Sequence, residues 1–238
     1  MHTLQPAGGI SGLVFLDNYR NNIVIDLLMK SYPMQVFRHW VYLPYLAAMG
    51  MLGDLKRGIV TQKIIELNEI GIDPSVGTRF ETISYANLQS SLMFAKNLGF
   101  DSFCDIGCGL GRSLVVANEC GFIDLYGVDI SDNLISKCQN NMSKVGVSAS
   151  LSCMDVTDFE IPSGKLVIYL FNPFGEERMT DLVKKLVCRE YETLVIYHNP
   201  KHSECFKNET KIKTHTWNHF GLYQEKAFIY LMPAKPKN

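Results

Sequence analysis

The sequence predicts an α/β fold: a doubly wound, mostly parallel sheet of seven strands with helices on both faces, preceded by a mainly helical N-terminal extension. Short apolar runs alternate along the chain with segments whose apolar residues recur at helical spacing. The run Leu166–Phe171 is almost continuously apolar, which is typical of a parallel strand buried on both faces. This repetition of strand and helix indicates a parallel sheet covered by helices.

The predicted elements follow one another along the chain without an internal repeat. A helix is expected over Thr82–Leu98, and Gly99 ends it. Five buried strands are expected, at residues 102–106, 125–129, 149–154, 166–171 and 194–197. Helices are expected after three of them, ending near Glu119, running from an N-cap at Ser131 to Val145, and covering 176–188. Residues 211–217 and 227–232 are expected to close the sheet as a hairpin-like pair.

The first part of the chain is predicted to be an appendage of the main domain. Residues 1–75 are assigned to an N-terminal helical extension, and residues 76–238 to the ligand-binding domain. Helices are expected within 21–30, 35–48 and 59–70, with Pro33 and Pro44 as interruptions. The apolar run Val41–Leu52 is too short to span a bilayer. It is open to three interpretations, as packing on the domain, a dimer contact or a membrane contact, and the first two are favoured.

Charge and cysteine usage narrow the classes of function. The formal net charge is −1 and no cluster of Lys and Arg is present, so duplex nucleic acid is not expected as a main partner. The seven cysteines are scattered without a C-x-x-C pair, which is typical of reduced thiols in a cytosolic protein. Cys104 and Cys153 lie in apolar runs and are expected in the core. The N-terminus does not read as a signal peptide, and a cytoplasmic location is expected.

The stretch Phe103–Gly111, Phe-Cys-Asp-Ile-Gly-Cys-Gly-Leu-Gly, is predicted to carry the chemistry. A short buried strand is expected to turn sharply at the glycines and to run directly into a helix. Without Cβ atoms there, a ligand can lie against the main chain, close to the N–H groups and positive dipole end of the helix. A dinucleotide site would need a third glycine where Arg112 stands, which disfavours that class. A glycine-rich turn without a ligand is the other alternative.

The spacing Asp-x-Gly-x-Gly-x-Gly, from Asp105 to Gly111, resembles the first motif of the class I S-adenosylmethionine-dependent methyltransferases. The stretches Leu166–Gly175 and Ile196–His202 are similar to those of bacterial members of this family that lack an assigned substrate. The resemblance covers about residues 78–205. It implies a Rossmann-like core, S-adenosyl-L-methionine as cofactor and methyl transfer as the activity. It also implies that the N-terminal extension caps the ligand site.

The resemblance assigns roles to residues near the first two strand ends. Asp105 would face the ammonium of the ligand's methionine part. Gly107, Gly109 and Gly111 would accommodate its homocysteine part and ribose. Asp129, 24 positions after Asp105, would accept hydrogen bonds from both ribose hydroxyls. The alternative for Asp129 is an acid that caps the next helix.

Three further residues would hold the adenine of the same ligand. Asp155, after the third strand, would accept from the adenine amino group, and the N–H of Val156 would reach a ring nitrogen. Ile130 would pack on the adenine face. A solvated loop acid is the alternative for Asp155, and ordinary core packing is the alternative for Ile130.

The acceptor side is predicted from the ends of the fourth and fifth strands. Asn172-Pro173-Phe174 partly resembles the D/N-P-P-Y/F motif of methyltransferases that modify planar amino nitrogens, but its second proline is absent. Asn172 is expected to lie between cofactor and substrate, to contact both and to take part in catalysis. His198 is the candidate general base for an acceptor that must lose a proton.

Other residues are predicted to contact the substrate. They are Phe174, Tyr85 and Arg79. Core packing is the alternative for Tyr85, and a solvated loop charge is the alternative for Arg79. No metal site is expected, because the His pairs at four-residue spacing lack helical context and a third ligand.

The predicted function is methyl transfer from S-adenosylmethionine to an unidentified N or O acceptor, which would be a small molecule, a glycan or a protein side chain. The alternatives are a non-catalytic binding subunit of the same fold and, less favoured, a nucleotide-dependent oxidoreductase. No transmembrane segment is expected, and a homodimer through the N-terminal extension is one interpretation of its apolar run.

Overall fold

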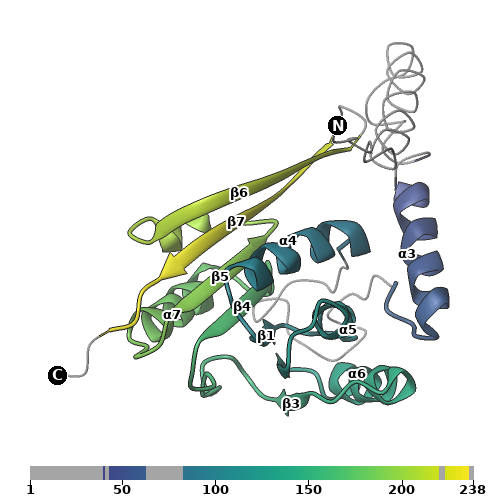
Figure 1. Ribbon diagram of the computed structural model, residues 1–238, viewed down its shortest axis with the longest axis horizontal. Coiled ribbons are helices and arrows are strands. Elements are labelled where there is room, and N and C mark those ends of the chain that lie inside the picture. The colour runs from purple at the N-terminus through teal and green to yellow at the C-terminus, as the bar shows by residue number, and fades with distance from the viewer. Residues whose placement is uncertain (1–39, 41–42, 63–82, 220–222, 236–238) are drawn as a thin grey trace, which may run out of the picture. The chain divides into compact units, whose positions relative to one another are not determined.

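The computed structural model describes residues 40, 43–62, 83–219 and 223–235 (Figure 1). The chain divides into two compact units, of which the larger comprises Leu46–Trp217 and Glu225–Asn238. The larger unit contains the central part of the sheet and the helices that pack against it.

The described elements follow the predicted alternation of strand and helix. The helices are α3 (Leu43–Arg57), α4 (Tyr85–Asn97), α5 (Arg112–Glu119), α6 (Asp132–Val145), α7 (Glu176–Val187) and the short 3₁₀ helix η3 (Ser203–Phe206). The strands are β1 (Ser102–Ile106), β2 (Asp124–Asp129), β3 (Ser150–Cys153), β4 (Leu166–Phe171), β5 (Thr193–His198), β6 (Thr210–His219) and β7 (Tyr223–Met232). The predicted N-cap at Ser131 is confirmed, because its side chain accepts a hydrogen bond from the N–H of Leu134.

The seven strands form one mixed sheet in the order β3-β2-β1-β4-β5-β7-β6. The strands β1 to β5 are parallel, and β7 runs antiparallel to β5. The predicted doubly wound, mostly parallel sheet is therefore confirmed. The chain moves from β1 outward to β2 and β3, and β4 then takes the place on the other side of β1. Ligands of such sheets bind beyond the carboxyl ends of the strands where the order reverses, which here is the β1–β4 boundary.

Each face of the sheet has its own hydrophobic core, as alternation along the strands requires. On one face Phe103 of β1 packs with side chains of α4, α5 and α6, which include Leu88, Leu92, Leu114, Ile135 and Cys138. On the other face Cys104 packs with side chains of α7 and η3, which include Met179, Leu182 and Phe206. Helices thus cover both faces, as predicted, and α4 and α7 lie on different sides of the sheet (Figure 1).

The structure corrects the predicted helices of the N-terminal part. α3 extends from Leu43 to Arg57, beyond the predicted end at residue 48. Pro44 lies in its first turn, where the missing N–H interrupts no helical bond. Residues 59–62 are not helical, because the Asp54 carboxylate binds the N–H groups of Thr61 and Gln62 at 2.5 and 2.6 Å. The rest of the helix predicted over 59–70, the one within 21–30 and the domain boundary after residue 75 lie outside the described residues.

The two cysteines that were predicted to lie in the core differ in their exposure to solvent. Cys104 is fully buried, as predicted, but Cys153 is exposed, so its predicted place in the core is wrong. The reason is that β3 lies at the edge of the sheet, where the strand's two end residues are exposed. Within the described part of the chain, every helix is too short or too polar to serve as a membrane span.

We predict that replacing Gly111 with alanine lowers the free energy of unfolding by more than backbone strain alone explains, because this position is closely packed. A Cβ at Gly111, where φ is +84°, would lie 2.6 Å from Cys138 Sγ, whereas one at Gly146, where φ is +67°, would meet nothing within 4 Å. Gly146→Ala should cost about 1 kcal/mol through strain alone, and Gly111→Ala about 1–3 kcal/mol more through overpacking. Urea unfolding of both variants measures the difference, and equal losses would contradict it.

Candidate functional site

The glycine turn after β1 is fixed by the end of β2. The N–H groups of Gly107 and Cys108 both donate to the carbonyl of Val128, at 2.8 and 3.1 Å. Gly107, Gly109 and Gly111 have φ values of +85°, +52° and +84°, a left-handed backbone that side chains rarely adopt. The turn therefore depends on glycine at these positions, and Gly111 leads directly into α5.

The end of β4 also packs on this turn. A Cβ at Gly107 would lie 2.7 Å from Cβ of Pro173, so the loop after β4 approaches the main chain as closely as glycine allows. Pro173 follows Asn172, a predicted site residue. The turn consequently brings the carboxyl ends of β1, β2 and β4 together, and with them Asp105, Asp129 and Asn172.

Asp105 is a buried acid in an unusual electrostatic position. It is 3% exposed, and the hydroxyl of Ser113 on α5 donates to its carboxylate. Burial raises the pKa of Asp105 to about 7; the hydrogen bond from Ser113 opposes the rise, and the negative charge of Asp129 adds to it. Among the described residues, no basic side chain forms an ion pair with Asp105. The carboxyl is thus suited to a cationic ligand group.

Asp129 lies at the end of β2 with both carboxylate oxygens in contact with backbone. Oδ2 accepts from the N–H of Gly109 at 2.9 Å, and Oδ1 accepts from the N–H of Ser131 at 3.0 Å. Burial raises the pKa of Asp129, although these two hydrogen bonds oppose the rise. Each oxygen retains lone pairs that can accept a further hydrogen bond. Ile130, the next residue, is 40% exposed and is therefore not an ordinary core residue.

Asp155 is engaged by its own loop and by α7. Its carboxylate accepts from the N–H and hydroxyl of Thr157 at 2.9 and 3.0 Å and pairs with Arg178 at 3.1 Å. Burial alone would raise the pKa of Asp155, but these partners outweigh burial and lower it. Asp155 is thus a partnered loop acid, and the neighbouring Val156 is buried in the core on the α7 side.

Two of the predicted site residues, Asn172 and Phe174, follow the end of β4, and both are buried. Asn172 has φ +46°, is 3% exposed and accepts a hydrogen bond from the hydroxyl of Tyr197 at 3.2 Å. A non-glycine residue in this region indicates a position that its surroundings impose. Phe174 is buried in the core beside α7, so in this structure its ring packs inside the protein.

His198 ends β5 in a fully buried, largely aromatic environment. Its Nε2 lies 3.1 Å from the hydroxyl of Ser91, and its ring stacks on Trp217 with 5.1 Å between centroids. Burial lowers the pKa of His198 to about 3, and the neighbouring His215 contributes. Such an imidazole is a weak base without contact to solvent. Its catalytic role stays a prediction, which this environment does not favour.

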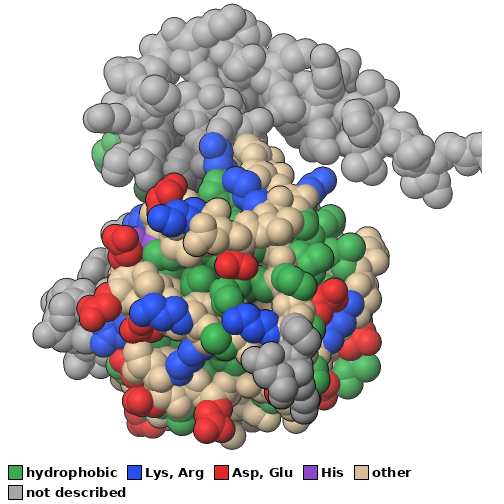
Figure 2. Space-filling view, turned by 90° about the vertical axis from the view of Figure 1, so that its left-hand side faces the viewer, with side chains coloured by type: hydrophobic (Ala, Val, Ile, Leu, Met, Phe, Trp, Pro, Cys, Tyr) green, Lys and Arg blue, Asp and Glu red, His purple; other side chains and the backbone are tan. Residues whose placement is uncertain are grey.

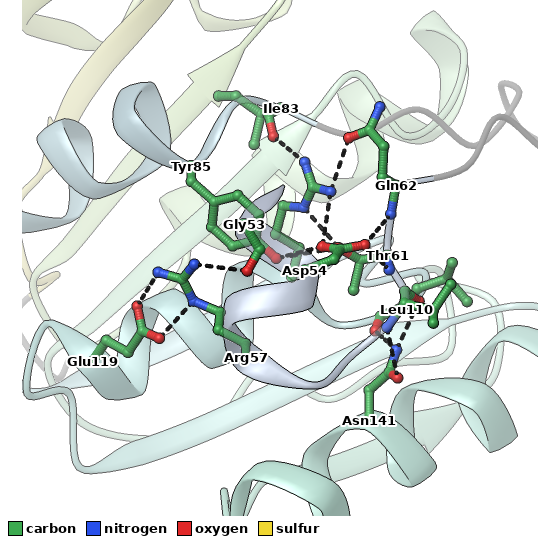
Figure 3. Close-up of polar contacts among 12 residues, drawn as sticks. Gly53, Asp54, Arg57, Thr61, Gln62, Ile83, Tyr85, Leu110, Glu119 and Asn141 are labelled. Atoms are coloured by element: carbon green, nitrogen blue, oxygen red, sulfur yellow. Dashed lines mark hydrogen bonds and ion pairs between the residues drawn. The ribbon is translucent and has the colours of Figure 1, made fainter. Parts of the chain in front are cut away.

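Tyr85 lies at the start of α4 in a polar network that connects α3, α4 and α5 (Figure 3). Its hydroxyl donates to Asp54 Oδ1 at 2.5 Å, and the guanidinium groups of Arg57 and Arg112 lie 4.1 and 4.4 Å from its ring centroid. Burial and the hydrogen bond to Asp54 raise the pKa of Tyr85 to about 12. Arg79 lies outside the described residues.

Sequence reasoning missed this network because its members are far apart in the chain. Arg112 and Asp54 are 58 positions apart. The available signals were an arginine in place of a third glycine and an acid inside an apolar helix. Within the described part of the chain, no group of three His, Cys, Asp or Glu side chains is placed to hold a metal ion.

Comparison with known proteins agrees with the fold. The family model described as "Methyltransferase domain" matches residues 103–187. Curated relatives include two ribosomal protein L11 methyltransferases: one from Thermotoga petrophila is 23% identical over 72% of this chain, and one from Thermotoga neapolitana is 26% identical over 40% of it. The matched parts span 65% and 37% of those proteins' own lengths. An RNA methyltransferase from Salinibacter ruber, solved with S-adenosyl-L-homocysteine, superposes with a TM-score of 0.50 at 15% identity over 66% of this chain and 97% of that one.

The methyltransferase-domain model matches residues 103–187, and together with this strand order the match supports the resemblance to the class I S-adenosylmethionine-dependent methyltransferases. The cofactor of that family is S-adenosyl-L-methionine. The resemblance of the glycine motif to this family is thereby confirmed.

We predict that Asp105 makes the ligand-free protein less stable as pH rises. In the unfolded chain Asp105 loses its proton near pH 4, whereas in the folded protein its pKa is about 7. Between these pH values the folded protein therefore binds one more proton than the unfolded chain. Stability contributed by the protonated form is therefore lost as pH rises through this window. Asp105→Asn removes the loss, so its stability relative to wild type should increase from pH 5 to pH 8, on the order of 1–3 kcal/mol.

Urea unfolding at the two pH values measures this change. Asp124→Asn, at the exposed start of β2, is the control for removing one carboxyl group. A difference between Asp105→Asn and wild type that is the same at both pH values would contradict the prediction.

Proposed function

We propose that this protein transfers the methyl group of S-adenosylmethionine to an N or O acceptor, with the cofactor bound at the carboxyl ends of β1, β2 and β3. One observation supports this site most directly. Asp105 is a buried carboxyl without a basic partner among the described residues. It lies beside a glycine turn whose left-handed backbone would be strained by any residue with a side chain. A cationic ligand group with little bulk beside the turn fits both features.

In this proposal the chain's acids hold the cofactor. Asp105 binds its ammonium, which returns the carboxyl to its ionised form. Asp129 uses the remaining lone pairs of its two oxygens for the ribose hydroxyls. The exposed side chain of Ile130 packs on the adenine. The loop of Asp155 and Val156, which Thr157 and Arg178 hold in place, binds its polar edge.

The protein's main contribution to transfer is alignment. S-adenosylmethionine supplies a methyl group already activated by a positively charged sulfur. The chain therefore has to orient the acceptor and exclude water. Asn172 is the candidate for this orientation, because its left-handed backbone is held by close packing at Gly107 and by Tyr197. We further propose that transfer does not depend on proton transfer to His198, which is buried away from solvent.

The acceptor in this proposal is a protein side chain, a glycan or a small molecule. The formal net charge of −1 argues against duplex nucleic acid. On the face that Figure 2 views, Lys and Arg side chains are interspersed with Asp and Glu. The names of the two Thermotoga relatives favour a protein acceptor.

We also retain two wider proposals about the whole protein. A cytoplasmic location is proposed from the scattered cysteines. A homodimer contact through α3 is proposed because Met49, Leu52 and Leu55 are exposed at helical spacing, and sedimentation velocity would detect it.

We predict that Asp129→Ala weakens cofactor binding. Calorimetry should show wild-type binding of S-adenosylmethionine and S-adenosylhomocysteine, and each hydrogen bond lost in the variant should cost about 1.5–3 kcal/mol. Asp124→Ala, at the opposite end of the same strand, should bind as wild type does. No wild-type binding at millimolar ligand would refute the proposed function, and unchanged affinity in Asp129→Ala would place the ribose elsewhere.

We predict that His198→Gln retains activity within about tenfold, because removing a general base typically costs far more, about 10²–10⁴-fold. The measurement is formation of S-adenosylhomocysteine from S-adenosylmethionine with a desalted cell extract as acceptor pool. The variant's melting temperature should fall, since the ring fills a buried position. A loss of 10²-fold or more in a folded variant would instead assign base catalysis to His198.

A further inference from the structure

Arg112, which directly follows the glycine turn, bonds to residues of the N-terminal part of the chain. It is the first residue of α5, directly after Gly111, and only 4% of it is exposed. Its three guanidinium nitrogens all donate hydrogen bonds. Nε donates to Thr61 Oγ1 at 2.8 Å, Nη1 to the Ile83 carbonyl at 2.6 Å, and Nη2 to Asp54 Oδ1 and Gln62 Oε1 at 3.2 and 2.9 Å.

Asp54 is the carboxylate that accepts hydrogen bonds from several groups of this network (Figure 3). Besides Arg112, it accepts hydrogen bonds from the N–H and hydroxyl of Thr61, the N–H of Gln62 and the hydroxyl of Tyr85. Burial alone would raise the pKa of Asp54, but these donors outweigh burial and lower it. The acid therefore stays ionised inside the protein and fixes the chain from residue 54 to residue 62 against α4 and α5.

Asn141 of α6 connects the same segment to the glycine turn itself. Its Nδ2 donates to the carbonyl of Leu110 at 3.0 Å and to the carbonyl of Val60 at 3.1 Å, and its Oδ1 accepts from the N–H of Val60. Leu110 is the residue between the second and third glycines of the turn. One buried side chain thus bonds the turn and residue 60 together.

Two glycines of α3 allow this close association. A Cβ at Gly53 would lie 2.4 Å from the ring of Tyr85, and one at Gly50 would lie 1.9 Å from the side chain of Gln62. On the outer side, Arg57 pairs with Glu119 of α5 at 2.6 and 2.7 Å. The helix and the segment after it therefore pack on α4, α5 and the turn through several independent contacts.

We infer that Arg112 and Asp54 are positioning residues, and that residues 54–62 help to hold the glycine turn in the conformation that binds the cofactor. The inference rests on the proposed function, because it assigns cofactor binding to this turn. Its physical basis is that the turn and the segment share partners, so ordering either one favours the other. By linkage, cofactor binding must then stabilise the docked segment to the same extent.

The test compares two arginines with similar hydrogen bonding, of which Arg112 is buried and Arg189 is half-buried. Arg112→Lys keeps the charge but loses the planar fork that serves four acceptors. Arg189→Lys is the matched control, because its three nitrogens donate to Thr193 Oγ1 and to the carbonyls of Pro162 and Gly164, all at 2.8 Å. These hydrogen bonds lie at the amino-terminal end of β5. The candidate site lies at the carboxyl ends of the parallel strands, so the control residue is at the opposite end.

Two measurements on the full chain are made with S-adenosylhomocysteine as the probe. In calorimetry, the Arg112→Lys variant should bind the probe about tenfold more weakly than wild type. The Arg189→Lys variant should bind it within twofold of wild type. This difference in affinity is expected even if both variants have a lower melting temperature. In limited trypsin digestion read by mass spectrometry, the ligand should slow cleavage after the exposed Lys56 in wild type and Arg189→Lys, and less so in Arg112→Lys.

The outcomes separate this inference from the proposed function. Wild type that does not bind the probe refutes both. Wild type that binds, with Arg112→Lys binding equally well or with both lysine variants weakened alike, overturns the inference alone. Unchanged cleavage after Lys56 in wild type with ligand also overturns it. If Arg112→Lys does not fold, Asp54→Asn takes its place and the same criteria apply.

Discussion

The close approach of main chain and side chains at Gly107 and Gly111 is the constraint on which the ligand edge of the sheet depends. Gly107 admits Pro173 from the end of β4, and Gly111 admits Cys138 and Met142 from α6. Because the interior is close-packed, these contacts leave little freedom for the turn between them. The positions of the site residues at the ends of β1, β2 and β4 follow from this packing more than from any bond that the residues form with one another.

Three acids near this turn, of which Asp54 and Asp105 are buried and Asp129 is half-buried, differ in how well their charge is compensated. Asp54 has enough donors to remain ionised, and its pKa is lowered despite burial. Asp105 and Asp129 have fewer, and burial raises the pKa of both. The first arrangement stabilises a structure, whereas in the second the hydrogen bonds compensate the ionised acids only in part for burial. Local disagreement of this kind is expected where a sequence serves a ligand and not the fold alone.

The sequence predicted the parallel sheet well, because apolar runs such as Leu166–Phe171 and the cap at Ser131 are local signals. The ends of strands were equally readable, which is why Asp105 and Asp129 were recognised as neighbours. Features set by distant residues were not readable. α3 takes its end from Asp54, and His198 is enclosed by Ser91 and Trp217 from two other elements. Periodicity carries no information on such contacts, nor on which strand lies at the edge of the sheet.

The edge position of β3 also gives the protein a built-in attachment point for a reporter group. Cys153 ends this strand with its thiol exposed, and its Sγ lies 3.8 Å from the carbonyl of Ile130. The other exposed cysteine of the described residues, Cys188, follows α7 at the amino-terminal side of β5. With Cys188 replaced by serine, an environment-sensitive dye on Cys153 would sit beside the residues assigned to the adenine. The chain would then report occupancy of that edge by its own fluorescence, without any knowledge of the acceptor.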